Sequence, residues 1–482
     1  MARSLKSNIF YNVINAAVSF LFPIITLPYA SRVLFADGLG QIDFFTSIIS
    51  YIVLATSLGI PLYGVREVAR CRDDKERFNK TTAEIYILQN LFAVLGYVIV
   101  AILCLFYDKV QDNRLLFCVL SLTIGFNALG AQWFFQAIED FKYIAIRALC
   151  IKILCIICIF LFVENRDDVL NYAIISVSVN IGNATFNVSR LLKCLDFEII
   201  RRCKLDIKKH IQPALKIFSL NLTTSLYNYL NVFLLGVLAC NEAVGLFSTP
   251  MKFVMLLLGV TSIISTVLIP RFSNIVNKND NKQLRELGGK VFNVINMIVF
   301  PLAITVVIIS KPLILVLCGD SFVESINVMR IVAPIILLIG NSGMIGLQFL
   351  YPQGKENIVI KSTVVGALTS ITLNILLVPH FQEIGAAIAT VVAELIVLVM
   401  MISMGHKYIP VSLTSRNTLH IIVSTFVTAL VLIIVSMINL SQNTQLFTSA
   451  ILGLTTYITM LIVQRNEMIS YVIKEVKRLI VK

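Results

Sequence analysis

"IGAAIATVVAELIVLVMMISMG" extends from Ile384 to Gly405 and contains one charged side chain, Glu394, at its eleventh position. At a rise of about 1.5 Å per residue, a helix of this length crosses the hydrocarbon core of a bilayer and places the carboxyl group near the midplane. The stretch therefore predicts a membrane-spanning helix. A carboxyl group at that depth is costly, so it needs a hydrogen-bonding partner or a function.

The rest of the chain has the same character. Hydrophobic residues make up 57% of the 482 residues and charged residues only 14%, whereas soluble domains contain about 25% charged residues. Span-length apolar runs recur along the chain, which predicts an all-α polytopic membrane protein. We count about fourteen spans, at 9–30, 42–63, 83–106, 115–136, 148–163, 169–190, 217–238, 252–270, 291–309, 326–350, 362–378, 385–405, 418–438 and 446–463.

The basic residues test this count. If both termini lie on one side of the membrane, that side holds 33 of the 40 lysines and arginines. The side rich in lysine and arginine is cytoplasmic, so we predict cytoplasmic termini. The net charge of +13 is then mostly a topology signal, and nucleic acid is not expected as a partner.

Internal similarity predicts two lobes in a pseudo-two-fold repeat. The basic connection 190–216 separates spans 1–6 from spans 7–12. The stretches 37–40 and 242–245 correspond in the two halves, and Gln132 corresponds to Gln348. We expect an N-lobe at 1–200, a C-lobe at 201–405, and two further spans with an amphipathic cytoplasmic tail at 406–482. Chance similarity between short apolar segments is the alternative.

The sequence lacks the groups that catalysis needs. It contains no Walker A loop, no Ser/His/Asp arrangement and no connection long enough for a catalytic domain. The four histidines are far apart and the ten cysteines are scattered, so we expect no metal site. These observations favour a transporter, not an enzyme, without a cofactor other than Na⁺ or H⁺ as a coupling ion.

Asparagines form stripes on two adjacent spans. Their spacing places each group on one helical face. Such amides either join helices or line a hydrated cavity that suits sugars. The residues are Asn180, Asn183 and Asn187 in span 6, and Asn221, Asn228 and Asn231 in span 7.

Cations also lie at depth, near both ends of the spans. Snorkelling explains each one separately, whereas together they indicate a cavity that attracts anions, with arginine able to bind phosphate oxygens in a fork. These residues are Arg32, Lys152, Lys216, Lys252 and Arg330. Two acids, Asp43 and Glu394, are candidates for ion coupling, and a structural hydrogen bond is the alternative for Glu394.

Four stretches resemble a known family. They are "PYASRVLFADGLGQIDFFTSI" (28–48), "WFFQAIEDFKYI" (133–144), "LVLCGDSFVESINVMRIVAP" (315–334) and "LNILLVPHFQEIGAAIATVVAEL" (373–395). The chain resembles, over about residues 5–405, the polysaccharide-transport branch of the multidrug/oligosaccharidyl-lipid/polysaccharide (MOP) exporter superfamily, which includes O-antigen and capsule repeat-unit flippases. It departs from that family at Phe35 and at 380–383, where the family carries glycine.

The resemblance implies a function. The expected fold is two six-helix lobes around a cavity, working by alternating access. The expected cargo is an oligosaccharide linked to undecaprenyl diphosphate, moved across the bacterial inner membrane for lipopolysaccharide or capsule synthesis. Implied partners are this lipid-linked substrate, membrane lipids and the polysaccharide polymerase and chain-length machinery. Alternatives are a cation-coupled drug or metabolite exporter and a peptidoglycan-precursor (lipid II) flippase.

Overall fold

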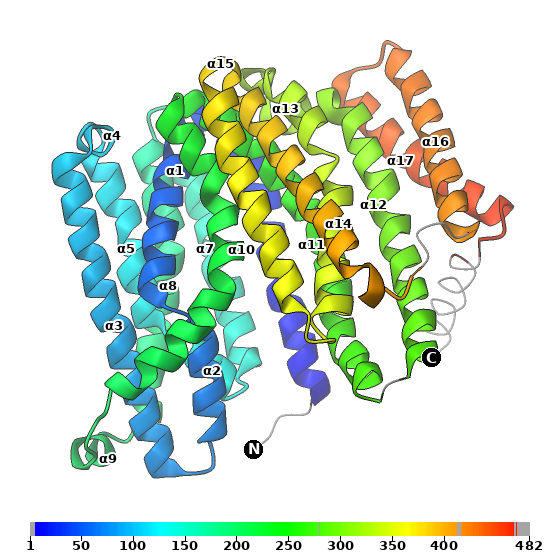
Figure 1. Ribbon diagram of the computed structural model, residues 1–482. Helices are drawn as coiled ribbons and strands as arrows, with labels where there is room; N and C mark the ends of the chain where they lie inside the picture. The colour runs from blue at the N-terminus through cyan, green and yellow to red at the C-terminus, as the bar shows by residue number, and fades with distance from the viewer. Residues whose placement is uncertain (1–4, 279, 412–415, 467–468, 470–482) are drawn as a thin grey trace. The chain divides into compact units, whose positions relative to one another are not determined.

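A computed structural model describes residues 5–278, 280–411, 416–466 and 469, without the side chains of 5–10, 13, 219–228 and scattered positions between 260 and 281. Every regular element in these residues is a helix (Figure 1). The chain forms two compact units, Met1–Phe233 and Leu234–Lys482, called here the N-terminal and C-terminal units. The division into segments 1–200, 201–405 and 406–482 stays a prediction.

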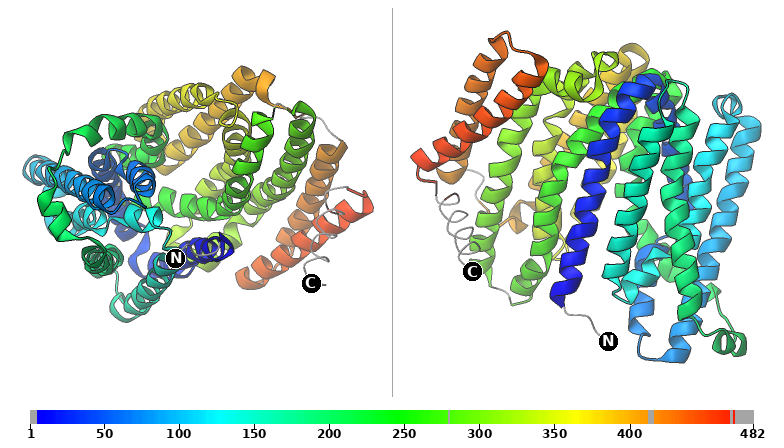
Figure 2. Two further views of the ribbon diagram at one scale, coloured as in Figure 1. Left: turned by 90° about the horizontal axis from the view of Figure 1, so that it is seen from below. Right: turned by 180° about the vertical axis from the view of Figure 1, so that it is seen from behind.

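The N-terminal unit is a bundle of long helices joined by short ones. In it, α1 packs against α7, and α5 packs against α8 (Figure 2). Its elements are α1 (Leu5–Ser57), α2 (Ile60–Arg70), α3 (Lys75–Phe106), α4 (Asp108–Gln111), α5 (Arg114–Gly130), α6 (Gln132–Ala137), α7 (Phe141–Phe162), α8 (Val169–Cys194), α9 (Phe197–Arg202), η1 (Lys208–His210) and most of α10 (Ile211–Leu238).

The C-terminal unit is a second bundle, in which α16 and α17 pack on each other and on α12. Its elements are α11 (Asn241–Asn277), α12 (Asn281–Cys318), η2 (Asp320–Phe322), α13 (Ser325–Val332), α14 (Ile335–Met344), the π-helix η3 (Ile345–Leu350), α15 (Glu356–Gly405), η4 (His406–Tyr408), α16 (Arg416–Met437) and α17 (Gln442–Val463).

The helices account for the fourteen predicted spans. Eleven segments of the described chain are long and apolar enough to cross a membrane. Two of them, Ile14–Arg70 and Glu356–Tyr408, each contain two spans, because a single non-helical residue divides them. The 28-residue α10 supplies the remaining span. The predicted all-α membrane fold is therefore confirmed.

Several boundaries differ from the sequence prediction. Residues 31–41, which lie between the first two predicted spans, are helical apart from Phe35, and Leu34, Ala36 and Leu39 of this segment are buried. The span expected at 148–163 begins at Phe141, and the span expected at 252–270 begins at Asn241. The predicted amphipathic tail after Asn466 lies almost wholly outside the described residues.

A buried tryptophan packs against neighbouring helices at one end of the N-terminal unit, the end that is predicted to be cytoplasmic. Trp133 of α6 is buried, and its Nε1 donates to Gln89 Oε1 at 2.6 Å. A Cβ at Gly64 of α2 would lie 2.7 Å from Trp133 Cε3. The ring therefore packs directly against the α2 backbone, which only glycine allows. This is the single tryptophan of the chain, so its fluorescence reports on the unit.

The segment before α10 is held by a buried carboxylate. Glu84 of α3 is fully buried and accepts from Lys209 Nζ at 2.7 Å, from Asp206 N at 2.7 Å and from His210 Nε2 at 2.9 Å. His210 Nδ1 lies 2.6 Å from the Tyr63 hydroxyl. Because the carboxylate only accepts, Nε2 carries a proton, and in the neutral ring Nδ1 accepts from Tyr63. Three donors thus offset the desolvation of Glu84.

We expect Glu84→Gln to lower the unfolding midpoint of the purified protein in detergent, followed through Trp133 fluorescence. The amide keeps the shape but loses the ion pair and one acceptor, a cost of about 1–3 kcal/mol. Glu198→Gln is the matched control, since Glu198 is 84% exposed and pairs only with Arg202 at 3.7 Å, and it should change stability by less than about 0.5 kcal/mol. Equal midpoints for the two variants would contradict the proposed role of Glu84.

Candidate functional site

Two helices turn at residues that are not glycine. Phe35 in α1 has φ 57° and ψ −177°, and Gln382 in α15 has φ 45° and ψ −122°. A side chain with positive φ costs about 1–3 kcal/mol and is retained where the surroundings hold it. Both residues lie in the stretches where the sequence departs from the family's glycines. At Phe35 the ring is covered by Arg166, whose Cζ lies 5.4 Å from the ring centroid.

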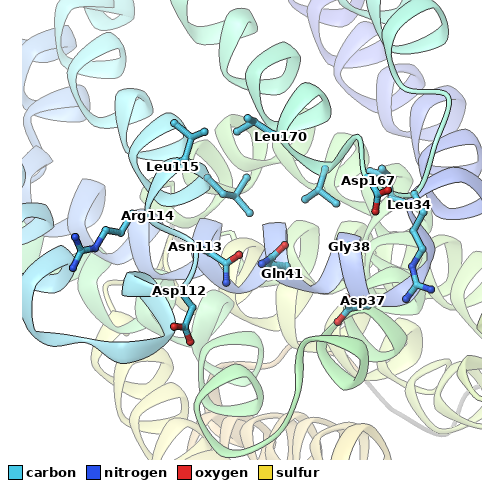
Figure 3. Close-up of a pocket in the computed structure, with 13 residues that line it drawn as sticks. Leu34, Asp37, Gly38, Gln41, Asp112, Asn113, Arg114, Leu115, Asp167 and Leu170 are labelled. Carbon is cyan, nitrogen blue, oxygen red and sulfur yellow. The ribbon is translucent and has the colours of Figure 1, made fainter.

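A polar pocket of about 450 Å³ lies beside the Phe35 turn (Figure 3). It adjoins the end of α4, which lies at the end of the N-terminal unit opposite α9 (Figure 1). Three chain segments meet there: α1 after its turn, the connection from α4 to α5, and the start of α8. The pocket carries both signs of charge and offers hydrogen-bond donors and acceptors. Its polar lining consists of Asp37, Gln41, Asp112, Asn113, Arg114, Arg166 and Asp167.

A second pocket, of about 180 Å³, lies inside the same unit between α1, α5 and α10. Its polar lining consists of Thr46, Ser50, Thr123, Asn127 and Tyr229. The Tyr229 ring stands at 79° to Tyr51, with centroids 6.0 Å apart. Neutral hydroxyl and amide groups beside aromatic rings are the groups that bind sugars.

The polar groups of this interior pocket are available to a ligand. Many threonines in the spans donate to the carbonyl four residues earlier, as Thr56 does to Ile52 O at 2.8 Å. Thr46, Ser50, Thr123 and Asn127 make no such bond within the part of the chain that the structure describes. Sequence analysis missed them because it followed asparagines only, although 46 and 50, and 123 and 127, have the same one-turn spacing.

The predicted asparagine stripes have different environments. Asn187 is 1% exposed, donates to Gly130 O at 2.5 Å and accepts from Arg147. It satisfies a carbonyl where α5 ends at Ala131, which has φ 37°. Asn180 and Asn183 are half-buried, and Asn231 of α10 is buried. The side chains of Asn221 and Asn228 lie outside the described residues.

The predicted cations are spread over both units. Lys152 Nζ lies 3.0 Å from Ser19 Oγ, so α7 and α1 meet there. In the C-terminal unit, Arg330 Nε donates to Ser310 Oγ at 3.0 Å. Arg32 and Lys216 are exposed, and Lys252 is half-buried. None of the five lines either pocket described above.

The predicted acids lie in one unit each. In the N-terminal unit, Asp43 is half-buried in α1. In the C-terminal unit, Glu394 is 6% exposed.

The two arms of α15 pack against each other near Glu394. A Cβ at Gly366 would touch Val397, and its next contact would be Ala393 O, so the arms before and after Gln382 pack antiparallel. One and two turns from Gly366, Ser370 and Asn374 are fully buried on the same face, and Asn374 Nδ2 donates to Ser370 O at 2.7 Å. Glu394 therefore lies on the arm that packs against this polar strip.

Comparison with known proteins gives the family. The model of the polysaccharide biosynthesis protein family matches residues 5–276, which is more than half of the chain. The chain belongs to this family. It is thus a multi-span membrane protein of the polysaccharide-transport branch of the MOP superfamily, as the sequence resemblance indicated.

Two relatives cover most of the chain. The putative O-antigen transporter of Shigella dysenteriae is 24% identical over 83% of this chain and 99% of its own length. The putative O-antigen transporter of Escherichia coli K12 is 20% identical over 83% of this chain and 96% of its own length. Because these relatives are named as transporters, the prediction that the protein is not an enzyme is confirmed.

Solved structures confirm the fold. The lipid II flippase MurJ, in an inward closed conformation, has a TM-score of 0.73 and 16% identity over 95% of this chain and all of its own. An inward-facing multidrug resistance MATE transporter of the MOP superfamily has a TM-score of 0.60 and 13% identity over 85% of this chain and 96% of its own. At these identities the likeness shows the fold alone.

Substitution of two asparagines in α8 distinguishes a structural from a cavity role. We expect Asn187→Ala to lower the unfolding midpoint, because the Gly130 carbonyl and Arg147 lose their partner, at about 1–3 kcal/mol. Asn180→Ala, on the same face, should leave the midpoint within the equivalent of about 0.5 kcal/mol. Trp133 fluorescence on heating measures both, and a larger loss for Asn180→Ala would reverse the assignment.

Proposed function

We propose that the protein is a flippase for oligosaccharide linked to undecaprenyl diphosphate, an O-antigen or capsule repeat unit. In this proposal it moves the lipid from the cytoplasmic to the periplasmic leaflet of the bacterial inner membrane by alternating access. The observation that carries the proposal is the similarity to two named O-antigen transporters over nearly their whole length. Both termini are cytoplasmic in this proposal, because 33 of the 40 basic residues then lie on that side.

The interior pocket of the N-terminal unit suits the glycan. Its hydroxyl and amide groups are neutral and unbonded within the described residues, and Tyr229 supplies an aromatic ring. A glycan exchanges its hydrogen bonds with water for bonds to such groups at little net cost. We propose that Asn180, Asn183 and Asn231 extend the polar surface, whereas Asn187 is structural.

The cations suit the diphosphate. Lys152 and Arg330 each bond a serine hydroxyl, and no carboxylate among the described residues pairs with them. Their charge therefore stays available to an anion. We propose that these two residues, together with Arg32, Lys216 and Lys252, attract the diphosphate during the cycle. The proposed protein partners are the polysaccharide polymerase and chain-length machinery.

A lipid II flippase is the second candidate. It is favoured by the 0.73 TM-score to the lipid II flippase MurJ over 95% of the chain. Its cargo combines the same two chemistries, a sugar and a diphosphate, so the pockets and cations do not distinguish it. The drug-exporter alternative has weaker support, since the MATE structure scores 0.60.

Charge removal tests the diphosphate assignment. In a strain deleted for the gene, lipid-linked oligosaccharide should accumulate on the cytoplasmic side and surface polysaccharide should disappear. Wild type should restore both. Arg32→Gln and Arg330→Gln should each restore about tenfold less flux at equal expression, since a hydrogen bond to a charged group is worth about 1.5–3 kcal/mol.

The matched control is Arg202→Gln, because Arg202 is 82% exposed and outside the pockets. It should behave as wild type. Unchanged polysaccharide in both arginine variants would remove these residues from the pathway, and accumulation of lipid II alone would favour the second candidate.

Ion coupling is proposed for Glu394, with Asp43 as a second candidate. If Glu394 exchanges H⁺ or Na⁺ at its buried polar strip, Glu394→Gln should fold normally but transport should no longer respond to the H⁺ or Na⁺ gradient. Flux into proteoliposomes, with and without each gradient, measures this, and Glu198→Gln is the exposed control. A Glu394→Gln variant that keeps wild-type gradient dependence would leave the carboxyl group with a structural role.

A further inference from the structure

A third pocket lies between the start of α7 and the second half of α8, at the end of the N-terminal unit predicted to be cytoplasmic. It has a volume of about 390 Å³ and two kinds of lining. One wall is apolar, formed by Ile146, Cys150 and Phe186, and the other end is polar and mostly basic. The polar end consists of Asp140, Lys142, Tyr143, Arg147 and Arg190.

The charges of this pocket do not cancel. Arg190 pairs with Asp140, the one carboxylate in the lining. Arg147 is 6% exposed, and its nearest polar partner is the neutral amide of Asn187. Its Nε is buried and makes no hydrogen bond among the described residues. A buried guanidinium without a carboxylate is costly, and an anion bound beside it would remove that cost.

The arginines are held in place before any ligand binds. Both stack on one aromatic ring: Arg190 Cζ lies 4.1 Å, and Arg147 Cζ 5.3 Å, from the Tyr143 centroid. Contact with the ring and the bond to Asn187 restrict the motion of these side chains. Arg147, Arg190 and Lys142 line one end of the same pocket, and guanidinium and ammonium groups are donors that bind phosphate oxygens.

The surroundings indicate what carries that phosphate. Beside the pocket, the α7 surface exposes Ile146 at 46% and Ile153 at 49%, and α8 exposes Phe186 at 57%. In a membrane-spanning bundle such side chains face acyl chains. Basic pockets at the cytoplasmic ends of membrane helices bind anionic lipid head groups. A soluble anion would use the basic end and leave the apolar wall unpartnered.

We propose that this α7–α8 pocket binds an anionic glycerophospholipid of the surrounding leaflet. Its phosphate lies between Arg147, Arg190 and Lys142, and its acyl chains follow Ile146, Ile153 and Phe186. The site belongs to a lipid that stays with the protein. It requires only that the protein spans a membrane, and so it stands whether or not the cargo is an oligosaccharide lipid.

A lipid titration tests the proposal on the full-length protein, purified and delipidated in detergent. The probes are phosphatidylglycerol, phosphatidylethanolamine and inorganic phosphate. The readouts are the unfolding midpoint from Trp133 fluorescence and the number of lipids retained in native mass spectrometry. We expect phosphatidylglycerol to raise the midpoint and to be retained, and the other two to do neither at the same concentration.

Two variants and a matched control locate the site. Lys142→Gln with Arg190→Gln should weaken phosphatidylglycerol binding by about fivefold for each cation removed. Arg147→Gln should weaken it further, and the double variant suffices if Arg147→Gln fails to fold. Arg66→Gln is the control, because Arg66 also lies over a tyrosine, at 5.7 Å from the Tyr63 centroid, and pairs with Glu67 at 2.9 Å.

Arg66→Gln should bind phosphatidylglycerol as wild type does. Equal binding by the double variant and wild type would overturn the location of the site. Equal retention of phosphatidylethanolamine would overturn its preference for an anionic lipid. Stabilisation by inorganic phosphate at the same concentration would replace the lipid by a free anion and overturn the proposal.

Discussion

A backbone amide or carbonyl without a partner costs several kcal/mol in hydrocarbon, and this constraint shapes the whole protein. Within a helix the backbone groups bond one another. Where a helix ends, its last carbonyl groups need a different hydrogen-bond partner. At Ala131 that substitute is Asn187, whose amide donates to the buried carbonyl of Gly130. At Phe35 the chain turns within a single residue and resumes the helix at once. These two departures from the helix are short, and each has a neighbour, Asn187 at Gly130 and Arg166 at Phe35.

The same constraint separates buried charges into two kinds. Glu84 has three donors, including Lys209 and His210, and its desolvation is offset within the fold. Within the described residues, Arg147 has one hydrogen-bond partner, the Asn187 amide, and its buried Nε makes no hydrogen bond. The hydrogen bonds of Glu84 are complete within the fold, whereas Arg147 keeps a buried donor that can bind an anion. Whether a buried charged side chain already has all its hydrogen-bond partners, more than its charge alone, distinguishes a structural group from one that binds a ligand.

Transport of a glycan places a different demand on the interior. The ligand must bind through many weak neutral contacts and must leave again, so strong fixed charges are unsuitable at the sugar. The interior pocket of the N-terminal unit has that character, with hydroxyl and amide groups around Tyr229. The charged groups lie elsewhere: Lys152 and Arg330 bond serines in separate units. Sugar and diphosphate thus have separate sets of candidate partners within one chain.

The sequence by itself determined the all-α membrane fold class, because hydrophobic run length is a local, additive property, and four of its stretches resembled the family that the comparison then showed. It also placed Glu394 at the middle of a span. It could not distinguish the asparagines of α8, since Asn180 and Asn187 have the same spacing and differ only in what packs beside them. Nor did the sequence indicate the pockets at Tyr229 and Arg147, whose linings come from two or three helices distant in the chain. Tertiary structure alone decided these, because whether a polar side chain is available to a ligand depends on which partners the neighbouring helices supply.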